Sequence, residues 1–254
     1  MSFPSLVAFD LDDTLTESKS PLPPPMTDAI TRLLRCVPVA IISGGRFEQF
    51  DEQVLRMLPP VAPLGELHIL PTCGTRYMRY LDGSWADIYR RDLSHAERSR
   101  AIASLTLRAQ QLGYWEPDDR VFGDRVEDRG SQVTFSALGQ RAAPDIKRAW
   151  DPDGAKRHAL RDLVAADLPD LEVAAGGSTS IDITQKGVDK AFGIKALAEQ
   201  TGIPLSAMLF VGDRTEPGGN DYPVVLLGVP TLSVTGWRDT LGVIGDLCDK
   251  LEDR

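Results

Sequence analysis

Four short apolar runs stand out towards the two ends of the chain. They cover residues 5–9, 37–42, 208–211 and 228–234. Short runs that are apolar at nearly every position are typical of strands covered on both faces, as in a parallel sheet. Helical stretches separate them, the first expected near residues 27–35 after a cluster of prolines. Strands that alternate with helices predict an α/β fold with a doubly wound, parallel-sheet (Rossmann-like) core.

The middle of the chain follows a different pattern. Helices are expected near residues 94–112 and 154–166. In the segment SQVTFSA, Val133 and Phe135 fall on one face of a strand and polar residues fall on the other, which is the period of a half-buried strand. The strands expected in this part are residues 131–137, 171–175 and 180–183. Helices combined with paired strands predict an α+β domain with an antiparallel sheet.

Charge divides unevenly between these parts. Residues 86–186 contain 15 of the 28 basic and 17 of the 37 acidic side chains, a net charge of −2, which leaves −7 for the rest. We therefore expect two domains: a core over residues 1–85 and 187–254, and an inserted α+β domain over residues 86–186. A relatively cationic insert beside a carboxylate-rich core suits an anionic substrate, because each sign of charge can bind its opposite.

The overall composition argues against several classes of partner. The formal net charge is −9, whereas nucleic acids and anionic membranes require clustered cations. The three cysteines are far apart and form no CxxC pair, which argues against a zinc knuckle or a disulfide scaffold. The first residues lack a basic signal-peptide region, and no apolar run approaches the roughly 18 residues of a membrane span. We expect a cytoplasmic protein without nucleic-acid or membrane partners.

Polar residues that could take part in catalysis or metal binding follow three of the expected strands. Asp10 and Asp12 come at the end of the first strand, Ser43 and Gly44 end the second, and Asp213 comes directly after the third. In an open parallel sheet, ligands bind outside the carboxyl ends of the strands. A single Asp-x-Asp after a strand is usually a turn or a helix cap. Its repetition across strands predicts a functional site at this edge.

The chemistry open to such a site is narrow. Clustered carboxylates repel one another unless a cation lies among them, and an all-oxygen site suits Mg²⁺. A carboxylate can attack phosphorus to give an aspartyl phosphate, and a second acid can protonate the leaving oxygen and then activate water. A lysine and a hydroxyl would hold the phosphoryl oxygens. No GxxxxGK[ST] or GxGxxG loop occurs, and the histidines have neither zinc nor triad spacing.

Four segments in order along the chain resemble the motifs of the haloacid dehalogenase superfamily of phosphotransferases. They are FDLDDTLT, AIISGG, Lys190 and GDRTEPGGND. The insert between the second and third motifs is similar to the α/β cap of the type IIB branch. The stretches LTESK, GGSTSIDITQKGVDK and GDRTEPGGNDY resemble those of eukaryotic-type phosphomannomutases. A phospho-accepting signalling module, which shares the sheet and the carboxylates, needs neither the insert nor an acid two residues beyond the nucleophile.

The resemblance implies a role for each matching core residue. Asp10 would be the phosphorylated nucleophile and a Mg²⁺ ligand, Asp12 the general acid/base with its backbone carbonyl on the metal, and Lys190 the residue that neutralises the phosphoryl charge. The remaining implied positions are the substrate contacts Thr14, Lys19, Ser43 and Gly44, and the metal ligands Asp213, Asn220 and Asp221. Asp13 stands where a glycine is common.

In the insert the match to the mutases is incomplete. Arg129 aligns with an arginine that binds the substrate phosphate, but the two further arginines of that cluster fall at Gln140 and Lys147. Arg141, next to Gln140, is the candidate replacement. The positions that contact the sugar are matched. They are Ser180 and Asp182.

The missing arginines influence the expected reaction. A mutase must hold a bisphosphate during turnover, which requires a firm site for the remote phosphate, and arginine provides it with bidentate geometry. We therefore expect a Mg²⁺-dependent phosphatase of a small sugar phosphate. The alternative is a phosphomannomutase that interconverts mannose 1-phosphate and mannose 6-phosphate. By analogy with mutases that pair through their caps, the resemblance also implies a homodimer.

Overall fold

The computed structural model describes residues 3–253 and divides into two compact units. The first, which we call the core, comprises Met1–Arg90 and Val188–Arg254, and the second, the insert, comprises Arg91–Gly187. The boundary that we expected at residue 86 lies within strand β5 (Ser84–Arg90). This strand pairs along its length with β4 (Arg76–Leu81), so the hairpin keeps the whole strand in the core.

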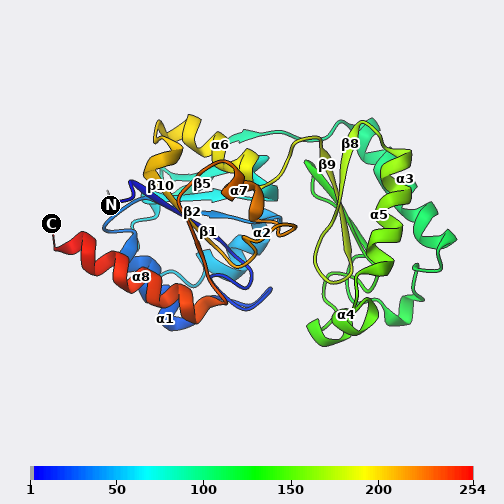
Figure 1. The fold of residues 1–254 in the computed structure, drawn as a ribbon, viewed down its shortest axis with the longest axis horizontal. Coiled ribbons are helices and arrows are strands. Elements are labelled where there is room, and N and C mark those ends of the chain that lie inside the picture. Colours follow the sequence, from blue (N-terminus) through cyan, green and yellow to red (C-terminus); the bar gives the residue numbers. More distant parts are fainter. Residues whose placement is uncertain (1–2, 254) are drawn as a thin grey trace. The chain divides into compact units, whose positions relative to one another are not determined.

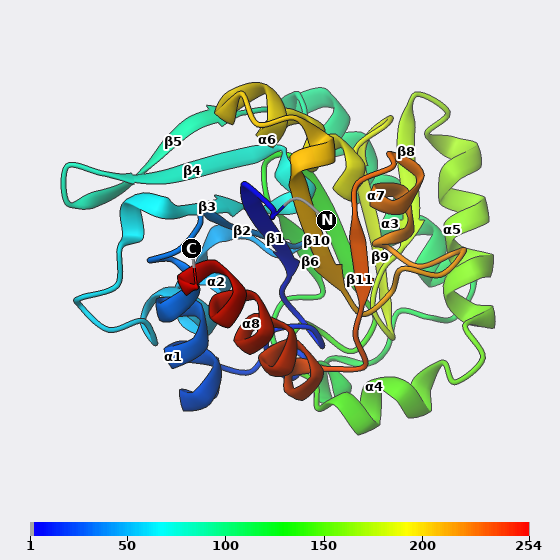
Figure 2. The same cartoon turned by 60° about the vertical axis from the view of Figure 1, so that its left-hand side comes forward.

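A seven-stranded sheet forms the centre of the core (Figure 1), in the order β11-β10-β1-β2-β3-β4-β5, with all seven strands labelled in Figure 2. The first five strands of that order are parallel, and the β4–β5 hairpin adds an antiparallel edge. The strands not yet given are β1 (Leu6–Asp10), β2 (Val39–Ile42), β3 (Leu67–Leu70), β10 (Met208–Gly212) and β11 (Thr231–Ser233). The chain runs outward from β1 in one direction first and later in the other, so β1 and β10 flank the switch point where such sheets bind ligands. The expected α/β class is confirmed.

Helices cover both faces of this sheet because β1 is apolar on both of its faces. Val7 and Phe9 pack in the cluster formed with α1 (Pro24–Leu33) and α8 (Trp237–Glu252), whereas Leu6 and Ala8 pack in the cluster formed with the helices on the other side. Those helices are α6 (Lys190–Thr201) and α7 (Tyr222–Leu226). Helices α1 and α8 lie side by side, away from α6 (Figures 1 and 2).

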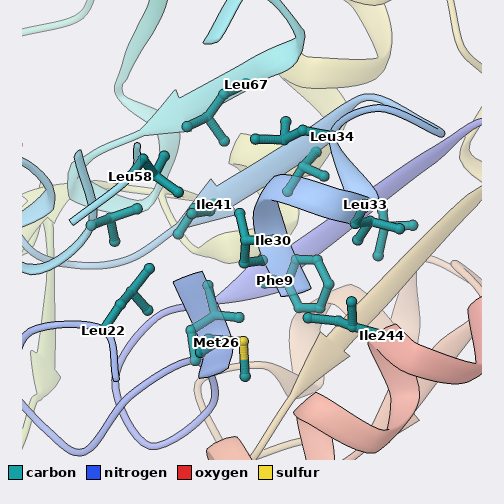
Figure 3. Packing of buried hydrophobic residues seen from close by; sticks show 14 of the residues in the cluster. Phe9, Leu22, Met26, Ile30, Leu33, Leu34, Ile41, Leu58, Leu67 and Ile244 are labelled. Atoms are coloured by element: carbon teal, nitrogen blue, oxygen red, sulfur yellow. The ribbon is translucent and has the colours of Figure 1, made fainter. Parts of the chain in front are cut away.

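Figure 3 shows the packing beneath α1. Phe9 of β1 lies among Met26, Ile30 and Leu33 of α1 and Ile244 of α8, and all five side chains are buried. The short helix α2 (Phe47–Phe50) continues into a π-helical turn, Asp51–Leu55. None of the helices within residues 3–253 is long and apolar enough to cross a membrane.

The insert is an antiparallel sheet with helices packed on one face. Its strand order is β6-β7-β9-β8. These strands are β6 (Val126–Asp128), β7 (Gln132–Ser136), β8 (Leu171–Ala175) and β9 (Ser180–Gln185), and the helices are α3 (His95–Gln111), α4 (Pro144–Trp150) and α5 (Ala155–Asp167). Val133 and Phe135 lie in the apolar cluster formed with α3 and α5, whereas the alternate residues Gln132 and Thr134 lie on the other face. The period of two in the sequence is therefore realised.

One buried polar group in the core makes its stability sensitive to acid. His68 in β3 is only 3% exposed, and its Nδ1 lies 2.7 Å from the hydroxyl oxygen of Tyr77, with the two rings stacked. Burial, reinforced by the nearby charge of Arg79, lowers the pKa of His68 from 6.5 to about 3. The folded protein therefore keeps this imidazole neutral at pH values where the unfolded chain takes up a proton.

We expect His68 to destabilise the fold as the pH decreases from its unfolded pKa of 6.5 towards 3. From about pH 7 to about pH 5 the free energy of unfolding should fall by about 2 kcal/mol more in the wild type than in His68→Asn, because only the wild type gains a proton on unfolding. Urea unfolding at both pH values measures the difference. His95→Asn, at an exposed histidine, is the matched control. Equal pH dependence in all three proteins would contradict the assignment.

Candidate active site

Three carboxylates meet at the switch point of the sheet. Asp10 is the last residue of β1, Asp213 directly follows β10, and Asp221 directly precedes α7. One oxygen from each lies within 4.8 Å of the other two. Asp10 and Asp221 are buried and Asp213 is half-buried. The convergence follows from topology, because β1 and β10 are parallel neighbours whose carboxyl ends lie at the same edge.

Lys190 supplies the positive charge of this cluster. It is the first residue of α6, and its side chain is only 1% exposed. Its Nζ lies 2.6 Å from Asp10 Oδ1 and 2.5 Å from Asp221 Oδ1. Helix α6 begins at this point because the Asp189 carboxylate accepts a hydrogen bond from the Phe192 amide. A buried ammonium is tolerated only when it is paired, and here two carboxylates pair with it.

The electrostatics of the cluster favour an additional cation. Burial raises the pKa of Asp10 to about 8, Lys190 opposes this shift, and Asp221 adds to it. Burial and Asp221 also raise the pKa of Asp213. Three carboxylates against one ammonium leave an excess of negative charge in a poorly solvated place. Because all the donors are carboxylate oxygens, the cluster fits a hard divalent cation.

The loop between Asp213 and Asp221 is fixed by backbone bonds that require its glycines. The Asp221 carboxylate accepts a hydrogen bond from the Arg214 amide, and the Asp221 amide donates to the Arg214 carbonyl. A Cβ on Gly219 would lie 2.0 Å from that carbonyl oxygen, so only glycine fits. Asn220 is exposed on the same loop. The GGND segment thus places Asp221 beside Asp10 and Asp213.

Asp12 is not among the three clustered carboxylates. Its Oδ1 accepts hydrogen bonds from the Lys19 amide at 2.6 Å and from Gln53 Nε2 at 3.2 Å, and its Oδ2 accepts one from Gln49 Nε2 at 2.9 Å. The glutamines belong to α2 and to the π-helical turn after it. Neither glutamine was predicted from the sequence. The one sequence signal that could have pointed to Gln49 and Gln53 is their spacing of four residues, soon after the Ser43 segment.

The remaining core candidates lie near these groups. The buried hydroxyl of Thr14 donates to Asp213 Oδ1 at 3.3 Å, so it is directed at a carboxylate of the cluster. Ser43 is buried at the end of β2, and its Oγ accepts a hydrogen bond from the Gly45 amide at 3.1 Å. Gly44, which lies between Ser43 and Gly45 in the sequence, is half-buried. The side chain of Lys19 is exposed, and its backbone amide donates to Asp12.

In the insert, Arg129 is paired with a residue that our sequence analysis did not consider. Its guanidinium lies 2.6 Å from the carboxylate of Glu127, and both side chains are about nine-tenths buried. The pairing follows from the spacing of two residues, which places both on one side of the chain near β6. Glu127 neutralises part of the charge that Arg129 would offer to a phosphate.

The polar face of the insert's sheet brings further candidates together. Asp182 accepts hydrogen bonds from Thr134 Oγ1 at 2.7 Å and from Gln132 Nε2 at 2.8 Å. Ser180 lies two residues before Asp182 on β9 and is half-buried. Our sequence analysis identified Ser180 and Asp182 but not the two neighbours on β7. Cross-strand pairing brings them together, because Thr134 lies opposite Asp182 in the register.

Hydrogen bonds also hold the residues at the positions where the mutases carry the two further arginines. Arg141 is exposed, and its amide donates to the carbonyl of Phe122. The ammonium of Lys147 donates to the carbonyl of Gln140 at 2.9 Å. The two positions where the mutases carry arginine are therefore adjacent in space, and a cation remains at one of them.

Comparison with known proteins shows a likeness to phosphomannomutases. The profile of the family described as eukaryotic phosphomannomutase matches residues 121–246. A probable phosphomannomutase from Caenorhabditis elegans is 23% identical over 234 residues, covering 87% of this chain and 85% of that protein. Phosphomannomutase 2 from Dictyostelium discoideum is 24% identical over 256 residues, covering 95% and 96% respectively.

Solved structures share the fold at low sequence identity. An IMP-nucleotidase from Plasmodium falciparum superimposes with a TM-score of 0.71 and 11% identity, over 97% of this chain and 68% of that one. A trehalose-6-phosphate phosphatase related protein gives a TM-score of 0.57 and 16% identity, over 98% and 100%. These structural likenesses show the fold. The family match and the curated relatives support a phosphomannomutase-like enzyme of the haloacid dehalogenase superfamily.

Proposed function

We propose that the protein is a Mg²⁺-dependent sugar-phosphate mutase that interconverts mannose 1-phosphate and mannose 6-phosphate. The observation that carries this proposal is the likeness to relatives named phosphomannomutase over 85% and 96% of their lengths, in a chain with a buried Asp–Lys–Asp cluster. This replaces the phosphatase that we expected first. The two reactions share the same first half, so the core site is compatible with both.

In the first half-reaction, an oxygen of Asp10 attacks one phosphorus of the substrate, which for the mutase is the sugar bisphosphate. The bond between phosphorus and the sugar oxygen breaks as Asp12 gives its proton to that oxygen, leaving an aspartyl phosphate. Lys190, which already lies against Asp10, offsets charge on the phosphoryl oxygens. A divalent cation held by Asp10, Asp213 and Asp221 would supply further positive charge and so reduce repulsion between the carboxylate and the phosphate.

In the second half-reaction, Asp12 takes the proton from the attacking hydroxyl, and the phosphorus–Asp10 bond breaks. A mutase presents the other hydroxyl of the sugar, whereas a phosphatase presents water. Gln49, Gln53 and the Lys19 amide bond both oxygens of Asp12 and so hold it in one orientation for either proton transfer.

Residues of the insert would hold the sugar and its second phosphate. We assign this role to Arg129, Arg141, Ser180 and Asp182, and the cation of Lys147 near Gln140 supports a remote anion site. Glu127 favours the phosphatase alternative, because it pairs with Arg129 and reduces the charge available to a second phosphate. The choice between mutase and phosphatase therefore depends on the insert.

The nucleophile is tested by Asp10→Asn. The neutral amide is a poor nucleophile, so turnover should fall by at least about a thousandfold, and removal of divalent cations with EDTA should have a similar effect. Asp13→Asn is the matched control, since Asp13 is exposed and asparagine tolerates its positive φ of 60°. Phosphorus NMR of the phosphoryl-transfer reaction reads out all three. Full activity of Asp10→Asn would overturn the mechanism.

The reaction type is tested with mannose 1-phosphate and Mg²⁺, with and without a trace of mannose 1,6-bisphosphate. A mutase should form mannose 6-phosphate only when the bisphosphate is present, because the bisphosphate phosphorylates Asp10 at the start. Phosphorus NMR distinguishes this product from inorganic phosphate. Inorganic phosphate as the sole product would refute the mutase in favour of the phosphatase.

The remote anion site is tested by a pair of substitutions. Arg129→Ala should raise the KM for mannose 1,6-bisphosphate by about tenfold or more, because a charge-assisted contact is lost. Glu127→Gln should lower the same KM, because it removes the carboxylate that neutralises the guanidinium. Steady-state kinetics measure both. Unchanged KM values in the two variants would show that Arg129 does not contact the substrate.

A further inference from the structure

A strained turn lies between the Ser43 segment and helix α6. Thr72, Cys73 and Gly74, which follow β3, have φ values of 48°, 55° and 82°. Three successive residues in the left-handed region are unusual, and two of them are not glycine, one being β-branched. Such strain persists only where surrounding structure imposes it, and it concentrates at functional sites.

On one side, the turn holds the segment that follows β2. The Thr72 amide donates to the Gly45 carbonyl and the Cys73 amide donates to the Ser43 carbonyl, each at 2.9 Å. The Gly45 amide in turn donates to Ser43 Oγ at 3.1 Å. That bond uses an acceptor position of the hydroxyl and not its hydrogen, so Ser43 keeps its O–H for another acceptor. The left-handed conformation is what aims two consecutive amides at these carbonyls.

On the other side, the backbone of the turn lies close to the backbone of α6. A Cβ on Gly74 would lie 2.3 Å from the Cα of Gly193, and a Cβ on Gly193 would lie 2.7 Å from the carbonyl oxygen of Cys73. Gly193 comes three residues after Lys190, which is about one helical turn. The Gly74 carbonyl is itself held by the hydroxyl of Tyr89 at 2.6 Å. An atom added at this contact must therefore change the spacing between the turn and the start of α6.

We propose that the turn Thr72–Gly74 is a positioning element of the active site, which fixes the spacing between the Ser43 hydroxyl and the Lys190 ammonium. The inference rests on the proposed role of these two groups in binding phosphoryl oxygens. It explains why two non-glycine residues adopt a strained conformation here, since a relaxed turn would aim its amides elsewhere.

Gly74→Ala tests the proposal against an unusually close control, Gly83→Ala. Both glycines have a φ of 82°, which alanine rarely adopts, but a Cβ at Gly83 meets nothing within 4 Å. With saturating Mg²⁺, Gly74→Ala should weaken orthovanadate binding by at least about tenfold, whereas Gly83→Ala should bind it as the wild type does. Calorimetry measures vanadate affinity, and electron paramagnetic resonance measures Mn²⁺ affinity. Mn²⁺ binding should be preserved, because Asp10 and Asp213 lie on other elements.

Equal vanadate affinity in Gly74→Ala and the wild type would overturn the proposal, as would a parallel loss of Mn²⁺ binding or the same loss in Gly83→Ala. If Gly74→Ala does not fold by circular dichroism, Tyr89→Phe takes its place, since it removes one anchor of the turn and adds no bulk. It should weaken vanadate binding in the same direction, and unchanged binding would overturn the proposal.

Ser43→Ala and Lys190→Ala separate this inference from the proposed function. If both lose vanadate binding while Gly74→Ala keeps it, the positioning role alone is refuted. If Ser43→Ala and Lys190→Ala both bind vanadate like the wild type, the two side chains do not hold phosphoryl oxygens, and the proposal is overturned together with the assignment beneath it.

Discussion

The buried ammonium of Lys190 is the interaction on which the rest of this site depends. It lies within hydrogen-bonding distance of carboxylate oxygens of both Asp10 and Asp221, and these three side chains are almost completely removed from water. Without it, neighbouring carboxylates would repel one another in a place where water cannot screen them. The pairing therefore ties together β1, α6 and the segment before α7. A shift of any of these elements would break at least one contact of the ammonium.

The sheet makes this arrangement possible. Strands β1 and β10 are adjacent although about two hundred residues separate them in the sequence. The insert is part of that intervening sequence. Because β1 is buried on both faces by α1 and α8 on one side and by α6 and α7 on the other, it cannot tilt without disrupting two apolar clusters. The polar groups at its carboxyl end are thus presented by a rigid scaffold. Catalysis that depends on orientation requires such a support.

The division of labour between core and insert has a chemical basis. Under the proposed mechanism, the core offers a nucleophile, an acid/base and cationic charge, which a transfer through an aspartyl phosphate requires. Whether the phosphoryl group then goes to a sugar or to water depends on what is held in place for the second step. In the insert the balance of charge around Arg129 is set by Glu127, a residue whose side chain faces it at 2.6 Å. A carboxylate can therefore influence the reaction outcome without touching the phosphorus.

The sequence by itself determined the class of fold and marked Asp10 and Asp213 as candidates, because apolar runs and the residues after them are local signals. Lys190 became a candidate only through the resemblance to known motifs. The sequence could not reveal the pairing of β5 with β4 across the expected boundary at residue 86, since that pairing is a contact between strands and not a local pattern. Only the tertiary structure brought Gln49 and Gln53 to Asp12, Glu127 to Arg129 and the strained turn at Cys73 to Ser43. These contacts depend on strand register, on helix placement and on backbone angles that L-residues rarely adopt. Hydrophobic periodicity records which face of an element is buried, but it does not record which polar side chains meet on the other face.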